Sequence, residues 1–295
     1  MAERARDPLI LVGEGWDDYG LIDSGHGRKL ERYGDYRFIR PEPQAMWTPR
    51  LADWGAHGEF VPGSDEDGGG RWRFDRPVPR EGWRLDWREV GFQAQCTPFR
   101  HLGFFPDMAP VWDWMRGQLA TPDASTLNLF GYTGVGTLAL SACGQVTHVD
   151  ASKKSVAQAR DNAALSGAAE RPIRWIVDDA AKFAAREVRR ERRYDGIILD
   201  PPKFGRGPAG ETWRLEENLP ALMADCRRLL DAHSRFLFLT VYAVRMSSLA
   251  LAGLLAELFG DLPGTIEHGD LAVREDGEGG RLLPTAIFAR WSNPG

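Results

Sequence analysis

Cysteine is scarce in this sequence of 295 residues, which contains only three. They are Cys96, Cys143 and Cys226, and no two of them form a Cys-x-x-Cys pair. A disulfide framework and a zinc site are therefore not expected, and we predict no metal. This cysteine usage is typical of a reducing compartment, so the predicted location is the cytoplasm.

Long apolar segments and an excess of positive charge are also missing. The most apolar run, Leu249–Phe259, contains Gly253 and Glu257 and is too short to span a bilayer. Residues Met1–Asp7 lack the apolar stretch of a signal peptide, so no membrane partner is expected. The formal net charge is −5, and any nucleic acid must therefore bind through a local basic patch.

The first 95 residues, rich in Trp, Gly, Pro and charged residues, predict a small β-rich domain. Apolar and polar residues alternate in Tyr36–Ile39 and Trp83–Trp87, which is typical of half-buried antiparallel strands. The polar stretch Pro62–Gly70 predicts an exposed hairpin loop. We therefore expect an N-terminal domain over residues 1–95, with substrate recognition as its candidate role.

Residues 96–295 follow a different pattern, in which short β-rich runs alternate with helical stretches. This alternation predicts an α/β domain whose mostly parallel sheet is covered by helices on both faces. A further helix is predicted over Asp107–Leu119. The expected strands are Thr126–Phe130, Val146–Val149, Ile173–Val177, Gly196–Leu199, Phe236–Val241 and Ala286–Ala289, and the helices lie near Val135–Ala142, Ser155–Ser166, Ala180–Arg193, Leu219–Leu230 and Leu249–Phe259.

The sharpest local signal is a hydrophobic strand that runs into the glycines Gly131, Gly134 and Gly136 and then into a helix. Glycines there let the backbone turn tightly and approach a ligand. Asp150 ends the next strand, at the spacing of about 20 residues where a Rossmann unit places its ribose-binding carboxylate. The alternative is a structural turn with a surface aspartate, and the spacing of Asp150 favours the cofactor site.

Acidic residues also end the two following strands. Asp178 or Asp179 can accept a hydrogen bond from an adenine amino group, although Asp179 is equally suited to cap the next helix. The fourth strand ends in Asp200-Pro201-Pro202-Lys203, whose prolines cannot continue a central strand. In an open α/β sheet these strand ends line the ligand crevice.

Together these motifs resemble the class I methyltransferases that modify large-subunit ribosomal RNA, over about residues 98–291. The matching segments are Asn-Leu-Phe-x-Tyr-Thr-Gly, Val-Asp-x-Ser, Asp-Asp and Asp-Pro-Pro-Lys-Phe, preceded by a lead-in at Arg100–Asp107. The resemblance implies a Rossmann-like, seven-stranded, mostly parallel sheet with a final antiparallel strand near Pro284–Ala289. It also implies S-adenosylmethionine (SAM) as cofactor, with S-adenosylhomocysteine as its product.

The resemblance assigns roles residue by residue. Asp150 would hold the ribose and Asp178 or Asp179 the adenine, while Lys203 is either a phosphate contact or a solvated surface lysine. The predicted catalytic wall is Asp200, Pro201, Pro202 and Lys203. The predicted cofactor residues are His101, Phe104, Phe105, Asp107, Asn128, Phe130, Gly131, Tyr132, Thr133, Gly134, Gly136, Asp150, Ala151, Ser152, Asp178, Asp179 and Ala180.

One departure from the family pattern bears on the acceptor atom. Members that make 5-methylcytosine carry a Ser-Cys-Ser turn after the fifth strand, where this sequence has Thr240–Ala243; position 201 is also Pro rather than Cys. Attack on cytosine C5 needs a covalent thiolate adduct. We therefore expect direct in-line transfer to RNA, with a purine nitrogen favoured over cytosine C5.

Two basic clusters are candidate RNA contacts. One combines Arg28, Lys29, Arg32, Arg37 and Arg40 with Tyr33, Tyr36 and Phe38, a composition suited to phosphates and base stacking. The other is Arg186, Arg189, Arg190, Arg192 and Arg193, where Glu187 and Glu191 favour a salt-bridged helix face.

Three rival functions stay open at this point. The first is an NAD-dependent dehydrogenase, which would favour Gly-x-Gly-x-x-Gly over the turn present here. The second is a SAM-binding module without catalysis. The third is methyl transfer to a protein or a small molecule, because the fold does not determine the substrate. The sequence does not indicate the oligomeric state.

Overall fold

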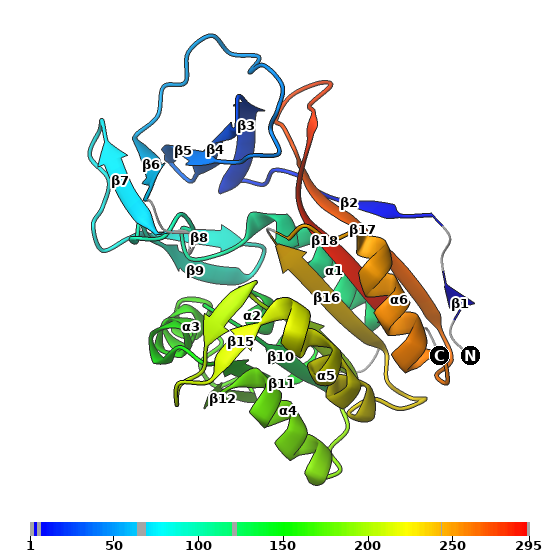
Figure 1. Ribbon diagram of the computed structural model, residues 1–295. Helices are drawn as coiled ribbons and strands as arrows, with labels where there is room; N and C mark the ends of the chain where they lie inside the picture. The colour runs from blue at the N-terminus through cyan, green and yellow to red at the C-terminus, as the bar shows by residue number, and fades with distance from the viewer. Residues whose placement is uncertain (1–2, 5–6, 64–68, 120–122, 243, 294–295) are drawn as a thin grey trace. The chain divides into compact units, whose positions relative to one another are not determined.

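The computed structural model describes residues 3–4, 7–63, 69–119, 123–242 and 244–293 (Figure 1). By its contacts the chain divides into two compact units. The α/β unit comprises Met1–Leu11, Pro110–Asp270 and Ala286–Gly295, and the β unit comprises Val12–Ala109 and Leu271–Thr285. The functional domains proposed above, 1–95 and 96–295, stay predictions; in this division, residues 96–109 and 271–285 pack with the N-terminal segment.

The α/β unit is built on a mixed sheet that confirms the predicted fold class. Within the described residues its order is β1-β17-β18-β16-β13-β10-β11-β12, with β2 also pairing with β17. Strands β10 to β13 and β16 are parallel, and β18 runs antiparallel to β16, as expected for the final strand. The bounds are β1 Glu3–Arg4, β2 Leu9–Gly13, β10 Ala124–Leu129, β11 Gly144–Asp150, β12 Ile173–Val177, β13 Gly196–Leu199, β16 Phe236–Tyr242, β17 Thr265–Arg274 and β18 Leu282–Ser292.

All six strands expected from the sequence are present. Within the described residues the sheet has nine strands rather than the seven expected, because β1, β2 and β17, which the sequence pattern did not locate, also join it. The helices also occur where they were predicted. Helix α4 ends earlier than expected, because the backbone turns left-handed at Glu191 (φ 54°). The helix bounds are η1 Pro106–Met108, α1 Ala109–Gln118, α2 Val135–Leu140, α3 Lys153–Leu165, α4 Ala180–Arg189, α5 Leu215–Arg228 and α6 Ser248–Phe259.

The central strands are apolar on both faces, so helices must cover both sides of the sheet. One face, including Leu127 and Leu199, packs with α4, α5 and α6 in a single hydrophobic cluster (Figure 1). On the other face Trp114 of α1 contacts Phe236 and Phe238, with ring centroids 5.6 and 5.4 Å apart. No helix within the described residues is long and apolar enough to cross a membrane.

The β unit contains a five-stranded sheet in the order β3-β4-β5-β6-β7 and a separate hairpin, β8–β9. Strands β5 and β8 confirm the two segments predicted from alternation. The sheet is not purely antiparallel as expected, because β5 and β6 run parallel. Residues 64–68 of the predicted hairpin loop lie outside the described residues. The bounds are β3 Tyr19–Gly25, β4 Arg28–Tyr33, β5 Tyr36–Pro41, β6 Gly58–Pro62, β7 Gly70–Phe74, β8 Trp83–Trp87 and β9 Val90–Ala94.

Two ionic networks join distant parts of the β unit. In its core Arg40 donates to both carboxylate oxygens of Glu31, at 2.7 and 2.8 Å, and Tyr19 donates to the same carboxylate. Near the end of the chain Arg281 donates to Asp23 and to Glu275, each at 2.8 Å. The second network ties Leu271–Thr285 to the N-terminal strands.

Candidate functional site

The register of the parallel strands brings the predicted site residues to one edge of the sheet. Leu129, the last residue of β10, pairs with Val149 of β11 on one side and with Leu199 of β13 on the other. Asp150 pairs with Val177, the last residue of β12. The segments beginning at Phe130, Asp150, Asp178 and Asp200 therefore all leave the sheet at its carboxyl edge, where open α/β sheets bind ligands.

The turn after β10 has an unusual backbone conformation. Phe130 (φ 59°), Tyr132 (φ 49°) and Gly134 (φ 84°) are all left-handed, which costs free energy at the two non-glycine residues. A Cβ built on Gly131 would lie 2.5 Å from the His148 ring, so only glycine fits there. The turn thus holds a partly buried stretch of left-handed backbone close to the strand end. Such strain is typical of ligand-binding turns.

Asp150 fixes this turn. Its Oδ2 accepts a hydrogen bond from the Tyr132 N–H at 2.9 Å, and its Oδ1 accepts one from the Ser152 N–H at 2.8 Å. Burial raises the pKa of the Asp150 carboxyl above its ordinary value, although both hydrogen bonds oppose that shift. Each carboxylate oxygen has a second lone pair, so the group can also accept from a ligand diol.

A row of buried, hydrogen-bonded polar side chains supports the same turn from the interior of the α/β unit. The Asn128 amide donates to Thr137 Oγ1 at 2.9 Å, and Thr137 Oγ1 lies 2.9 Å from His148 Nδ1. Burial lowers the pKa of His148 to about 3, which keeps the ring neutral. Asn128 is only 5% exposed, so the structure shows it as a support of the turn. Its predicted contact with the cofactor stays a prediction.

The acids after β12 have different partners. Asp179 is the N-cap of α4 and accepts from the Lys182 N–H at 2.9 Å, which confirms the capping alternative. Asp178 accepts from the Asp179 N–H and forms an ion pair with Arg186. Asp178 and Asp179 remain candidates for the adenine. Ala180 is the buried first residue of α4.

The remaining turn residues have structural contacts of their own. Ser152 caps α3 by accepting from Ser155 N–H at 3.2 Å, and Ala151 lies between it and Asp150. The Thr133 carbonyl accepts from the Asn162 amide at 2.9 Å. A Cβ on Gly136 would lie 3.2 Å from the Trp112 indole nitrogen. The backbone of the whole turn is therefore held from several sides.

The predicted catalytic wall leads into a small hairpin, β14 (Phe204–Arg206) and β15 (Thr212–Arg214). The Trp213 indole N–H donates to the Pro202 carbonyl at 2.7 Å. The same ring packs against Phe130 of the glycine turn, with centroids 5.1 Å apart. Trp213 thus joins the wall to the turn, and sequence reasoning missed it because no motif marks it.

Along the wall the side chains differ in exposure. Asp200 is half-buried, Pro201 is buried, and Pro202 and Lys203 are exposed. Phe204, which follows, is 44% exposed. The wall therefore offers one carboxylate, backbone carbonyls and exposed apolar surface at the carboxyl edge of the sheet.

The four lead-in residues belong to the β unit. Phe104 is 2% exposed and packs against Tyr33 and Phe92, while Phe105 contacts the His101 ring. Burial and the nearby Arg100 lower the pKa of His101. Their contact with the cofactor stays a prediction, as does that of Asp107, which accepts from the Thr285 hydroxyl at 2.6 Å.

The first basic cluster is not a single surface, and this corrects the sequence interpretation. Arg40, Tyr33 and Phe38 lie in the core of the β unit, at 5%, 0% and 0% exposure. Lys29 points to the same side and lies within 3.7 Å of Glu31 and 3.3 Å of Glu42. These residues alternate with exposed ones along the strands, so only part of the cluster can meet RNA.

The second cluster matches the salt-bridged helix face that the sequence favoured. Arg186 pairs with Asp178, and Arg190 pairs with the buried Glu187 at 2.9 Å. Arg189, Arg192 and Arg193 are exposed. Within the described residues, no group of three or more His, Cys, Asp or Glu side chains is placed to hold a metal ion.

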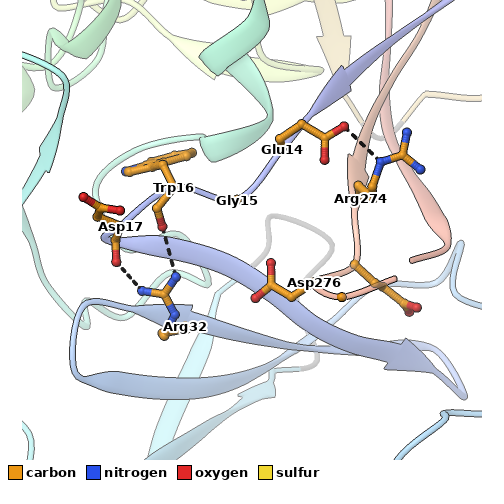
Figure 2. A pocket seen from close by; sticks show the side chains of 9 residues that line it. Glu14, Gly15, Trp16, Asp17, Arg32, Arg274 and Asp276 are labelled. Carbon is orange, nitrogen blue, oxygen red and sulfur yellow. Dashed lines mark hydrogen bonds and ion pairs between the residues drawn. The ribbon is translucent and has the colours of Figure 1, made fainter. Parts of the chain in front are cut away.

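The β unit also contains an open pocket of about 530 Å³ (Figure 2). Arg274 donates to Glu14 at 2.9 Å, and Arg32 turns its guanidinium toward the backbone oxygens of Trp16 and Asp17. Acidic groups outnumber the two basic ones, Arg32 and Arg274, around the pocket, and none of its residues is among the predicted cofactor or catalytic residues. Its lining residues are Glu14, Gly15, Trp16, Asp17, Arg32, Arg274, Glu275, Asp276 and Gly277.

Comparison with known proteins identifies the family of this fold and site. A family model described as S-adenosylmethionine-dependent methyltransferase matches residues 64–242, more than half of the chain. The crystal structure of a SAM-dependent methyltransferase from Agrobacterium tumefaciens superposes with a TM-score of 0.93 at 43% identity, covering 99% of this chain and 95% of that one. The structure of SMU.776 in complex with SAH shares the fold, with a TM-score of 0.71 at 16% identity over 93% of this chain and 75% of that one.

Curated relatives are more distant in sequence. Ribosomal RNA large subunit methyltransferase K/L of Aeromonas salmonicida is 27% identical over 270 residues, which are 83% of this chain and 37% of that protein. Ribosomal RNA large subunit methyltransferase I of Klebsiella pneumoniae is 33% identical over 126 residues, 40% of this chain and 28% of that protein. The matches thus cover about a third of the relatives' length.

Proposed function

Because this chain belongs to the S-adenosylmethionine-dependent methyltransferases, we propose that it methylates RNA, with large-subunit ribosomal RNA as the acceptor. The enzyme's cofactor is SAM, and the transferase assignment replaces the dehydrogenase and the non-catalytic alternatives. The observation that carries the proposal is the convergence of the strained turn, Asp150 and the Asp200 wall at one sheet edge. The names of the curated relatives support RNA as the substrate class.

The residues at this edge fit the cofactor. The left-handed backbone at Phe130 and Tyr132 turns the chain sharply at the carboxyl edge of the sheet, and Gly131 lets this turn pack closely on the His148 ring. Asp150 is already oriented by two backbone N–H groups and can accept from the two ribose hydroxyls. When bound, SAM supplies a methyl group on a positively charged sulfur and leaves as S-adenosylhomocysteine.

The chain's own contribution is to orient the acceptor. The Pro202 carbonyl accepts from Trp213, which fixes the wall. In this proposal Asp200 and the backbone carbonyls beside it accept hydrogen bonds from an amino group or ring N–H of a purine. Correct alignment of acceptor and methyl group supplies most of the rate in such transfers.

A purine nitrogen is the proposed acceptor atom because the thiols are poorly placed for covalent catalysis. Burial raises the pKa of Cys96 to about 12 and raises that of Cys226 as well. A thiolate is the form that attacks cytosine C5. Cys143 follows the carboxyl end of α2, whereas the glycine turn precedes the amino end of that helix. We also place the enzyme in the cytoplasm, on the cysteine usage alone.

The test is transfer of tritium from methyl-labelled SAM to three acceptor pools: ribosomal RNA, total protein and small metabolites. We expect label in the large-subunit RNA of a strain that lacks the gene, and digestion to nucleosides followed by mass spectrometry should show one methylated purine. Label in protein or metabolites alone would refute RNA as the acceptor. A methyl group on cytosine C5 would refute the proposed acceptor atom.

A further inference from the structure

Strand register gathers five arginines on one face of the β unit's sheet. Side chains alternate between the two faces, and directly paired residues point the same way. Arg32 pairs with Arg37, and Glu59 pairs with Arg73. Because Ile39 pairs with Glu59, this face continues from β4 and β5 onto β6 and β7. We call it the arginine face; its charged members are Arg28, Arg32, Arg37, Glu59, Arg71 and Arg73.

The opposite face of these strands forms the core. Phe38 lies 5.3 Å from Trp72, and Phe60 lies 5.3 Å from the same ring. Phe38 and Phe60 are 0% and 3% exposed. These aromatic residues pack on the inner face, and on the arginine face the buried apolar residue is Leu30 of β4, which is 1% exposed. Burial of apolar surface therefore does not require five arginines on the outer face.

The arginine face is strongly positive in a protein that is negative as a whole. Among these strand positions five arginines oppose one glutamate, which leaves four unit positive charges, whereas the chain carries −5. Arg28 and Arg73 both approach Glu59, at 3.4 and 2.6 Å. Arg37 and Arg71 are exposed. One carboxylate therefore cannot neutralise the surface.

Neighbouring groups orient these cations and extend the charge. Arg32 donates to the backbone carbonyls of Trp16 and Asp17, which direct the guanidinium, and Asp276 of the same pocket offsets part of its charge (Figure 2). Arg28 lies over the Trp54 ring at 5.5 Å. His57 accepts from the Arg37 N–H through Nδ1 and from the Arg76 N–H through its carbonyl, so Arg76 adds a further cation at this end.

We propose that the arginine face is the surface on which this methyltransferase docks its RNA, an inference that rests on the RNA acceptor proposed above. Adjacent strands lie roughly 4.8 Å apart, and each guanidinium group on them can bind phosphate in a bidentate manner or stack on a base. A protein partner would need exposed apolar anchors, whereas the apolar members of this face are buried (Leu30) or half-buried (Ile39 and Val61). The chemistry therefore favours RNA.

The test compares two triple variants that remove the same charge. Arg37, Arg71 and Arg73 are changed to Ala on the arginine face, and Arg189, Arg192 and Arg193 are changed to Ala in the α/β unit as the matched control. Affinity for a fluorescein-labelled, single-stranded 20-nucleotide RNA is measured by anisotropy at several salt concentrations. SAM affinity, measured by calorimetry, reports whether each variant keeps its fold.

We expect the arginine-face variant to bind this RNA at least tenfold more weakly at low salt. Its slope of log affinity against log salt should fall by about 2, since each phosphate contact on a single strand contributes about 0.7. The control variant should match the wild type, and SAM affinity should be unchanged in both. Poly-glutamate should compete poorly.

Four results would overturn the inference: equal losses in both variants, no loss in the arginine-face variant, no RNA binding by the wild type, or competition by poly-glutamate as strong as that by RNA. The last would indicate an acidic protein partner. If the arginine-face variant methylates ribosomal RNA as well as the wild type does, the surface is wrong but the RNA acceptor stands. If the wild type labels no RNA at all, the proposed function itself fails.

Discussion

Two carboxylates, Glu31 in the β unit and Asp150 in the α/β unit, are stabilised in opposite ways. In the β unit Glu31 and Arg40 are both buried, and the guanidinium meets both carboxylate oxygens. Burial pushes the pKa of Glu31 upward, but the charges of Arg40 and Lys29 and the hydrogen bonds from Arg40 and Tyr19 together outweigh it, and the pKa falls to about 2. In the α/β unit, within the described residues, Asp150 receives backbone N–H groups rather than a cation, and burial raises its pKa.

This difference separates a structural carboxylate from a functional one. Glu31 is neutralised by its neighbours, so it can interact with nothing else and serves the fold. Asp150 is held in place but keeps acceptor capacity and an unneutralised charge, which is the condition of a ligand-binding group. Variants at these two residues should therefore affect different properties, stability in one case and binding in the other.

The largest effect is expected from Arg40→Ala. Removing one partner of a buried ion pair leaves the other charge uncompensated and costs about 3–5 kcal/mol of folding free energy. Urea denaturation should show this loss. The double variant Glu31→Gln/Arg40→Met should recover much of it, because it removes both charges together. A loss below about 1 kcal/mol in the single variant would show that the pair is not the structural charge we describe.

The Glu31–Arg40 pair also makes the folding free energy depend on pH. Because the folded pKa of Glu31, about 2, lies below its ordinary 4.5, its contribution is complete above roughly pH 4.5 and is lost as the pH falls toward 2. The wild type should therefore lose more stability than Glu31→Gln between pH 5 and pH 3. Urea midpoints at several pH values measure this, and parallel curves for both proteins would contradict it.

At Asp150 a substitution should weaken cofactor binding rather than lower stability. Hydrogen bonds to a charged acceptor contribute about 1.5–3 kcal/mol, so Asp150→Ala should weaken SAM binding at least about tenfold by calorimetry. The exposed Asp161 of α3 offers a control, since Asp161→Ala removes the same charge from the same unit. An unchanged Kd in a folded Asp150→Ala protein would remove this residue from the site.

A smaller effect is expected at Trp213, which donates a hydrogen bond to the wall but contacts the glycine turn only through ring packing. Trp213→Phe keeps an aromatic ring against Phe130 and loses the bond to Pro202, so kcat should fall about two- to tenfold, equivalent to roughly 0.5–1.5 kcal/mol. Trp291→Phe is the matched control, because its indole also donates to a proline carbonyl, that of Pro263. If both variants lower kcat equally, the role of Trp213 is structural.

The smallest effect should come from the thiols. Changing Cys96, Cys143 and Cys226 together to Ala should leave most methyl transfer intact, since none is placed as a nucleophile. Steady-state rates with the identified acceptor test this. A complete loss of activity in a triple variant that still folds and binds SAM would restore covalent catalysis as the mechanism.

What the sequence revealed about the site depended on local patterns. The glycine turn, Asp150 and the Asp200 wall each follow a strand directly, so short segments were enough to find them. Their convergence followed from the parallel sheet, a regular structure whose strand ends meet at one edge. Trp213 could not be found in this way, because its contacts with Pro202 and Phe130 depend on how the hairpin folds back.

The arginine cluster shows a different failure. Arg28 and Arg32 are four residues apart in β4, so both side chains point to the outer face, whereas Lys29 and Arg40 point inward. The alternation of side chains along each strand was visible in the sequence, but the turn between β4 and β5 changes which residues share a face. A simple count of basic residues ignored this change. The buried partner of Arg40, Glu31, was identifiable only from the pairing of the strands.

The network around Arg281 has a consequence for synthesis of the protein. The β unit begins at Val12 but includes Leu271–Thr285, and Arg281 bonds Asp23 across 258 positions. A ribosome makes the N-terminal strands first, yet the segment that completes their ionic network is made only after the intervening residues Pro110–Asp270. The nascent β unit must therefore wait, with Asp23 unpaired by Arg281, until most of the α/β unit has been made.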